Sequence, residues 1–103
     1  MELNEVIEMG ILLEYYKPLL SEKQKEYLIK YFDKDLSFTE IAEENGITRQ
    51  AVHDNIKRGI KILKTYEEKL GFYKKDRIIY KKLLNLRENF EKDNLEKIIE
   101  ELN

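Results

Sequence analysis

The residues best suited to chemistry are the polar and cationic side chains between positions 48 and 64. Arginine can make paired hydrogen bonds to guanine and glutamine to adenine, while lysine and arginine neutralise phosphates. On a helix with about 100° per residue, Gln50, Lys57 and Lys61 face away from the apolar side. The candidate contact residues are Thr48, Arg49, Gln50, His53, Asp54, Lys57, Arg58, Lys61 and Lys64. Their types and spacing favour contact with double-stranded DNA.

The elements that would position these side chains are a helix, a turn and a second helix, from about residue 37 to residue 64. Ser37 and Glu40 have the spacing of a capping box at a helix start. Gly46 stands where the chain must reverse, because a helix end commonly needs a positive φ. Thr48 can cap the second helix. The inner face of that helix consists of Val52, Ile56, Gly59, Ile60, Leu63, Tyr66 and Leu70. This pattern predicts a helix-turn-helix, whose second helix enters the major groove of DNA, although ordinary helical bundles contain similar turns.

The charge of the chain is unevenly distributed, which matters more for phosphate binding than the overall balance of −2. Residues 1–44 carry 5 Lys/Arg and 11 Asp/Glu, and residues 83–103 carry 3 and 6. Residues 45–82 carry 11 Lys/Arg and only 4 Asp/Glu. The basic excess therefore coincides with the predicted reading helix and the segment after it, although lysines and arginines also solvate long helices.

The composition indicates a small all-α protein. The chain of 103 residues has no cysteine, so disulfides and thiolate chemistry are excluded. No apolar run approaches the roughly 18 residues that span a bilayer, and no secretory leader is recognisable, so we expect a cytoplasmic protein. We predict a single helical domain over 1–103, in which the helix-turn-helix at about 37–64 is followed by a C-terminal helical extension at about 72–103.

Caps and stops predict where the individual helices begin and end. The predicted boundaries are Asn4 to Tyr16, Ser21 to Phe32, Thr48 to Leu70 with Gly71 as the stop, Asp76 to Phe90, and Asp93 onward.

The first of these helices is apolar on more than one side, so it needs more than one packing partner. One face consists of Leu3, Val6, Ile7, Gly10, Ile11 and Leu13, and another of Met9, Leu12 and Tyr16. The helices after Gly71 also carry surplus apolar residues. These surpluses favour a homodimer, because two-fold dimers are the commonest oligomers and helix-turn-helix proteins often bind paired half-sites. The alternative is that the C-terminal helices fold back over the first helix of the same chain.

Few residues of the sequence favour a catalytic or a metal-binding site. His53 is the only histidine, and it lacks an orienting partner and a nucleophile. The acidic residues from Asp33 to Glu44 resemble a calcium loop, but Phe38 occupies the position that requires glycine. We expect neither an enzyme, nor a metal, nor a cofactor. Asp54 is unusual on a DNA-reading face, where it could accept a hydrogen bond from cytosine or pair with Arg58. Its presence also leaves open that the face binds something other than DNA.

The segment FTEIAEENGITRQAVHDNIKRGIKIL resembles region four of bacterial sigma factors, the part that docks on promoter DNA. Over nearly the full chain, the pieces LLEYYKPLLSEKQKEYLIKYFDKDLSFTEIAEE, ITRQAVHDNIKR and KILKTYEEKLGFY are similar to the small YlxM-type family of low-GC Gram-positive bacteria. The resemblance implies an all-helical helix-turn-helix protein with sigma-like topology. By motif, it carries DNA contacts to Thr48, Arg49, Gln50, His53, Asp54 and Lys57. The remaining sigma regions are absent from this chain.

Genes of that family tend to neighbour the gene of the signal recognition particle GTPase, so the resemblance implies a regulatory link to that pathway. The residues themselves favour a DNA-binding regulatory protein. The alternative is a protein-interaction or RNA-binding accessory factor of the targeting machinery, with the helix-turn-helix kept as a scaffold. Duplex RNA is the weaker ligand, because its deep, narrow major groove does not admit a helix easily.

Overall fold

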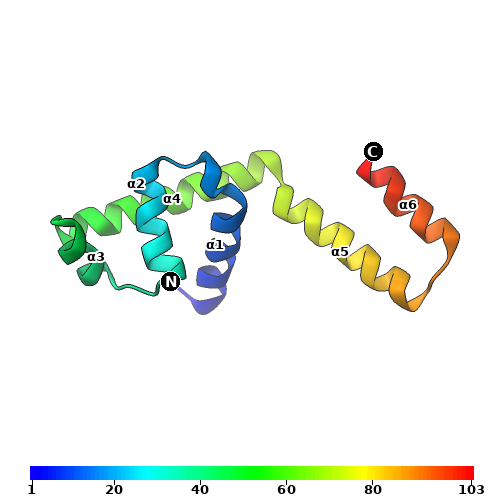
Figure 1. The fold of residues 1–103 in the computed structure, drawn as a ribbon, viewed down its shortest axis with the longest axis horizontal. Helices are drawn as coiled ribbons and strands as arrows, with labels where there is room; N and C mark the ends of the chain where they lie inside the picture. Colours follow the sequence, from blue (N-terminus) through cyan, green and yellow to red (C-terminus); the bar gives the residue numbers. More distant parts are fainter. The chain divides into compact units, whose positions relative to one another are not determined.

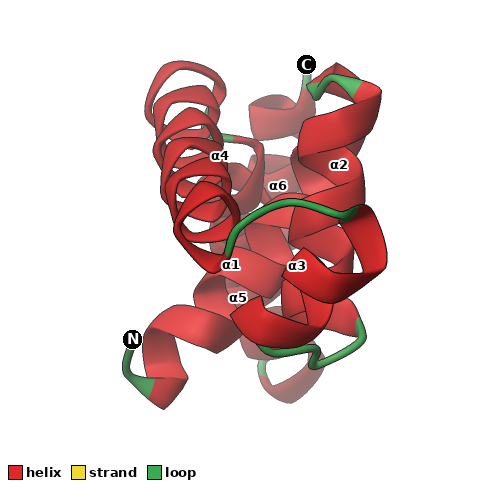
Figure 2. Cartoon of the chain, turned by 90° about the vertical axis from the view of Figure 1, so that its left-hand side faces the viewer, coloured by secondary structure: helices red, strands yellow, loops and turns green.

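The computed structural model describes residues 1–103, and every regular element in it is helical, which confirms the all-α prediction (Figures 1 and 2). The chain forms two compact units, Met1–Leu70 and Gly71–Asn103. The first contains α1 (Leu3–Tyr16), a 3-10 turn (Lys17–Leu19), α2 (Glu22–Leu28), a π-helical turn (Ile29–Asp33), α3 (Phe38–Asn45) and α4 (Arg49–Leu70). The second contains α5 (Phe72–Glu88) and α6 (Lys92–Leu102).

The long helix α4 is the centre of the first unit, because α1, α2 and α3 all pack against it (Figure 1). The largest fully buried side chains are Tyr16, Met9, Leu12, Leu13, Leu28, Ile41, Ile56, Leu63 and Val52. Near the end of α4, the hydroxyl of Tyr16 donates to Glu67 Oε1 at 2.5 Å, and that of Tyr66 to the carbonyl of Leu19 at 3.2 Å. The C-terminal end of α4 is therefore tied to α1 and to the turn that follows it.

The rest of the unit covers only one of the two apolar faces of α1 in full. Met9, Leu12 and Tyr16 of one face are buried, as is Leu13 at the end of the other face, whereas Ile7 of that other face is 54% exposed. The prediction that Asn4 caps this helix is wrong, because α1 begins at Leu3 and its cap residue, Glu2, makes no side-chain bond. Water can satisfy the first N–H groups of such an exposed helix end, so no polar side chain is required there.

The second predicted helix is not regular throughout. Ser21 caps α2 by accepting from the backbone N–H of Gln24 at 3.2 Å, as predicted, but the α-helix ends at Leu28. A π-helical turn follows, and the N–H of Leu36 reaches back to the carbonyl of Lys30 at 3.0 Å. The ammonium of Lys30 contacts Glu44 at 3.1 Å and Glu26 at 3.3 Å, which joins this turn to α3. The hydrogen bond with Glu44 is the main reason why the pKa of Lys30 is raised, with Glu26 adding to the effect.

Gly59 allows α2 and α4 to approach closely. It is buried, and a Cβ atom at this position would lie 2.8 Å from Cδ1 of Leu28, which is itself fully buried. Two carbon atoms do not normally approach within that distance, so glycine is required for this packing.

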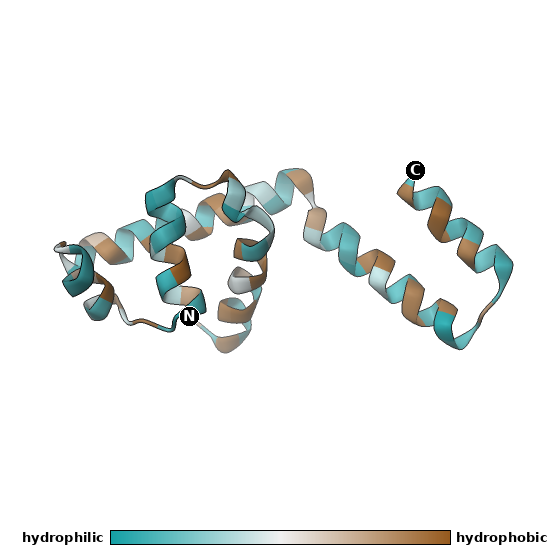
Figure 3. Ribbon diagram, in the orientation of Figure 1, coloured by the Kyte–Doolittle hydropathy of each residue, from teal (hydrophilic) through white to brown (hydrophobic).

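The second unit is a helical hairpin with a small core. Leu86 and Ile98 are its buried residues, and hydrophobic residues recur along both helices (Figure 3). Its helix starts differ from prediction. Gly71, at a φ of 62°, immediately precedes α5, which begins at Phe72 instead of Asp76 and ends at Glu88 instead of Phe90. Helix α6 begins at Lys92 with Glu91 as its cap residue, so Asp93 lies inside its first turn. An acidic residue is as favourable there as at the cap, because both positions lie at the positive end of the helix dipole.

Candidate nucleic-acid interface

The turn between α3 and α4 has the local geometry that its sequence predicts. The hydroxyl of Ser37 accepts from the N–H of Glu40 at 3.1 Å, and Glu40 Oε1 accepts from the N–H of Ser37 at 3.1 Å, a complete capping box. Gly46 ends α3 at a φ of 63°, a conformation that side-chain-bearing residues resist. The N–H of Ile47 then donates to the carbonyl of Ala42 at 3.1 Å. The helix-turn-helix is therefore fixed by local hydrogen bonds.

Thr48 starts the second helix of the motif. Its hydroxyl oxygen accepts from the N–H of Ala51 at 3.0 Å, which confirms the predicted cap. The hydroxyl proton is not consumed by this bond, so Thr48 can still donate to an anion at the helix N-terminus, where the helix dipole also favours negative charge.

Helix α4 has two chemically distinct faces. Its buried residues are Val52, Ile56, Gly59 and Leu63, all on the inner face predicted from the sequence. Its exposed residues include Arg49, Gln50, His53, Asp54, Lys57, Arg58, Lys61 and Lys64, and Thr48 before the helix is exposed as well. All nine candidate contact residues are thus accessible from solvent, and one segment of the chain carries them.

Asp54 pairs with neighbours on its own helix. Its Oδ1 accepts a hydrogen bond from Nε2 of Gln50 at 3.0 Å and lies 3.6 Å from Nδ1 of His53. The alternative pairing with Arg58 is not the one that the structure contains. Since a glutamine amide has two N–H donors and one acceptor oxygen, this bond leaves one donor and the acceptor of Gln50 available.

Phe38, the first residue of α3, supports two candidate contact residues and was missed by the sequence analysis. The guanidinium carbon of Arg49 lies 5.8 Å from the centre of its ring, and the ring of His53 meets it edge-on at 5.5 Å. Tyr31 stacks on the same ring at 4.9 Å. Its position directly after the capping serine was the available signal, because an aromatic ring there lies next to the start of the second helix.

The cationic part of the interface continues along α4. Lys57, Arg58 and Lys61 line a shallow hollow together with Asp54, the one carboxylate among the candidate residues. Between Arg49 and Lys64 the helix carries five Lys/Arg. This surface can bind a polyanion through several separate ion contacts, and each contact would make binding more sensitive to salt. No helix of the chain has the length and apolar character needed to cross a membrane.

Comparisons with known proteins agree on one family. Residues 3–102 match the sequence model of the UPF0122 family, described as "Putative helix-turn-helix protein, YlxM / p13 like", which is not an enzyme family. A UPF0122 protein from Fusobacterium nucleatum is 56% identical over 102 residues, which cover 99% of each chain. A UPF0122 protein from Streptococcus pneumoniae is 45% identical over 95 residues, which cover 91% of this chain and 86% of its own. One from Streptococcus agalactiae is 51% identical over 73 residues, 71% of this chain and 66% of its own.

Proposed function

Since the chain belongs to the UPF0122 family of YlxM/p13-like helix-turn-helix proteins, we propose that it is a DNA-binding regulatory protein that acts in the cytoplasm. In this proposal α4 lies in the major groove, as the second helix of such motifs does. The chain acts as a homodimer, so that two motifs meet paired half-sites of the operator.

The observation that carries this proposal is the separation of the two faces of α4. Val52, Ile56 and Leu63 anchor one face in the core, while the opposite face exposes base-reading and phosphate-binding side chains on the same rigid helix. A site on a packed helix holds its side chains in a fixed relative arrangement, which sequence discrimination requires. The cations of α4 supply the attraction to phosphate that a chain with an overall charge of −2 otherwise lacks.

The residues have separate roles in the proposed complex. Arg49 and Gln50, in the first turn of α4, read base edges, with arginine favouring guanine and glutamine favouring adenine. Thr48 and His53 border them. Phosphates are held by Lys57, Arg58, Lys61 and Lys64. Asp54 does not contact the nucleic acid in this proposal, but orients the amide of Gln50 through the 3.0 Å hydrogen bond.

The test begins with selection from a random duplex library at near-physiological salt, followed by binding measurements on two variants. Gln50→Ala should change the preferred bases. Lys61→Ala should weaken binding to all sequences and reduce the slope of log affinity against log salt by about one phosphate contact. Binding that does not depend on salt, or equal effects of the two substitutions, would contradict DNA reading by this face.

A second candidate function is supported by the surface of α1. Leu3 and Ile7 are exposed, and residues 1–16 carry four glutamates and no lysine or arginine. An acidic, apolar helix face is suited to a protein partner, and the family resemblance suggests the machinery of the signal recognition particle. Retained capture of the targeting GTPase by a variant lacking Arg49, Lys57 and Lys61 would support a protein-interaction role. Competition between duplex DNA and hairpin RNA for the unmodified protein would separate DNA binding from RNA binding.

A further inference from the structure

The hairpin of α5 and α6 has an apolar face that its own core does not use. At about 100° per residue, Tyr73, Ile78, Tyr80 and Leu84 of α5 lie on other sides, but both helices have apolar residues that share one side. They are Ile79, Leu83 and Leu86 of α5, and Leu95, Ile98, Ile99 and Leu102 of α6, which we call the hairpin face. Leu86 and Ile98 are buried where the helices meet, but Leu83 is 47%, Ile99 44% and Leu102 68% exposed.

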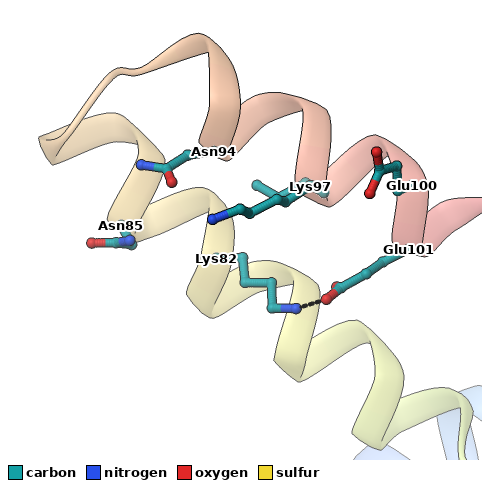
Figure 4. A pocket seen from close by; sticks show the side chains of 7 residues that line it. Lys82, Asn85, Asn94, Lys97, Glu100 and Glu101 are labelled. Atoms are coloured by element: carbon teal, nitrogen blue, oxygen red, sulfur yellow. Dashed lines mark hydrogen bonds and ion pairs between the residues drawn. The ribbon is translucent and has the colours of Figure 1, made fainter.

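The groove between the two helices is lined mainly by polar side chains, beside the buried Ile98. The ammonium of Lys82 pairs with the carboxylate of Glu101 across the two helices (Figure 4). Asn85, Asn94 and Lys97 line the same groove. The two helices are therefore joined by a polar contact as well as by Leu86 and Ile98, and neither contact covers Leu83, Ile99 or Leu102.

The small size of the hairpin favours a partner for the hairpin face. The second unit spans residues 71–103, fewer than the roughly 40 residues below which chains usually need disulfides, metals or association to fold. It has no cysteine, and no group of three or more potential metal ligands occurs in the chain. Packing against a further apolar surface, of this chain or of another molecule, is the remaining route to stability.

We propose that the hairpin face is covered by the hairpin of a second copy of this chain, so that two hairpins form an antiparallel four-helix bundle. A two-fold interface joins a surface to itself, and a single apolar face bordered by polar residues meets that requirement. This inference rests on the homodimer proposed above, and identifies its interface, but it does not depend on DNA binding.

The charges of the two helices determine which two-fold arrangement is favourable. Helix α5 carries six Lys/Arg and two Asp/Glu, whereas α6 carries two Lys/Arg and four Asp/Glu. An axis that runs along the hairpin places α5 of one copy over α6 of its partner, so that basic and acidic helices meet. An axis that runs across the hairpin places two basic α5 helices together, which like-charge repulsion disfavours. We therefore assign the first arrangement.

The exposed face of α1 is a poorer candidate for the same role. It is apolar at Leu3 and Ile7, but all four charged residues of segment 1–16 are glutamates. Two copies of α1 would therefore repel each other, and α1 set against a hairpin would meet the acidic α6 as well as the basic α5.

The test compares two isoleucines of similar exposure in the full chain: Ile99 on the hairpin face, 44% exposed, and Ile7 on α1, 54% exposed. Because a two-fold interface contains each residue twice, Ile99→Glu should raise the dimer dissociation constant at least about 100-fold, as measured by sedimentation equilibrium. Leu83→Glu should act in the same direction from α5. Ile7→Glu should leave the constant within about threefold, since its residue lies outside the interface.

Three results would overturn the assignment. They are a monomeric unmodified protein at high concentration, an Ile99→Glu variant that still dimerises as well as the unmodified protein, and an Ile7→Glu variant that dissociates. Circular dichroism on each variant checks that the helices remain. Binding of single half-site duplexes, measured beside the oligomeric state of each variant, separates the two proposals. Half-site binding with unchanged dimerisation of Ile99→Glu contradicts the interface alone, and dissociation of Ile99→Glu without any half-site binding by the unmodified protein contradicts DNA reading alone.

Discussion

Gln50 and Asp54 are joined by a 3.0 Å hydrogen bond from Nε2 to Oδ1, one turn apart on the exposed face of α4. This bond gives a carboxylate on a cationic surface a physical purpose. It restricts the rotation of an exposed amide and determines which of its atoms point outward, so that less side-chain entropy is lost when the amide meets a base. The same carboxylate repels phosphates, which opposes binding.

The two contributions of Asp54 can be separated by substitution. Asp54→Asn removes the charge but keeps an oxygen that can accept from Gln50, so affinity should rise several-fold at low salt and base preference should persist. Asp54→Ala should also raise affinity, but reduce discrimination at the base read by Gln50 by about three- to tenfold. Titrations of matched and mismatched duplexes measure both quantities. If Asn and Ala behave alike, Asp54 does not position Gln50.

The ring of Phe38 should affect DNA binding without touching DNA. Phe38→Leu removes the stacking surface beneath Arg49, an interaction worth about 0.5–1 kcal/mol at exposed sites, so affinity should fall about two- to fivefold. Phe38→Tyr keeps the ring and serves as the control. In an Arg49→Ala background, Phe38→Leu should have little further effect on affinity, because the interaction is already lost. An undiminished effect there would show that Phe38 does not act through Arg49.

The effect of Gly59→Ala on the free energy of unfolding should change sign when the side chain of Leu28 is removed. Alanine stabilises a helix interior by about 1 kcal/mol relative to glycine, but the added methyl group collides with Leu28, and overpacking costs about 1–3 kcal/mol. We expect a net loss of about 1 kcal/mol in the free energy of unfolding, measured with urea. In a Leu28→Ala background the space is open, and the same substitution should stabilise by about 1 kcal/mol. Destabilisation in both backgrounds would refute the contact as the cause.

The ion pairs of Lys30 predict a pH dependence of stability. The pKa of Lys30 is raised in the folded protein, chiefly by its hydrogen bond with Glu44. Its contribution is therefore complete below the ordinary lysine value of 10.5, and is lost as the pH rises through the folded value. In thermal melts, Lys30→Met should have a lower melting temperature than the unmodified protein by a constant amount around neutral pH. The difference should shrink above pH 10.5. Lys34→Met, at an exposed position, is the control. A difference in melting temperature for Lys30→Met that persists unchanged in strong base would contradict a stabilising role of the Lys30 ion pairs.

The sequence predicted those parts of the fold that depend on neighbouring residues. Ser37, Glu40, Gly46 and Thr48 each satisfy a backbone group a few positions away, so their roles were visible as spacing. Apolar periodicity likewise identified the buried side of α4, because apolar residues that recur every three or four positions fall on one face of a helix.

Features that depend on distant residues were not predictable in the same way. The π-helical turn after Leu28 is joined to α3 through Lys30 and Glu44, which are far apart in sequence. Both faces of α1 are apolar, so only its neighbours decide that Leu12 is buried and Ile7 exposed. In the candidate interface, residue types indicated exposure correctly, but the partner of Asp54 depended on side-chain conformations that spacing does not determine.

The position of α4 at the centre of its unit has a consequence for the thermodynamics of binding. Because three helices pack on α4, its middle amides should exchange with solvent deuterium only when the whole unit opens. A ligand on its outer face would thus meet the part of the unit that opens last. Such a ligand would not have to freeze a mobile backbone, and its affinity would be limited mainly by dehydration and ion release.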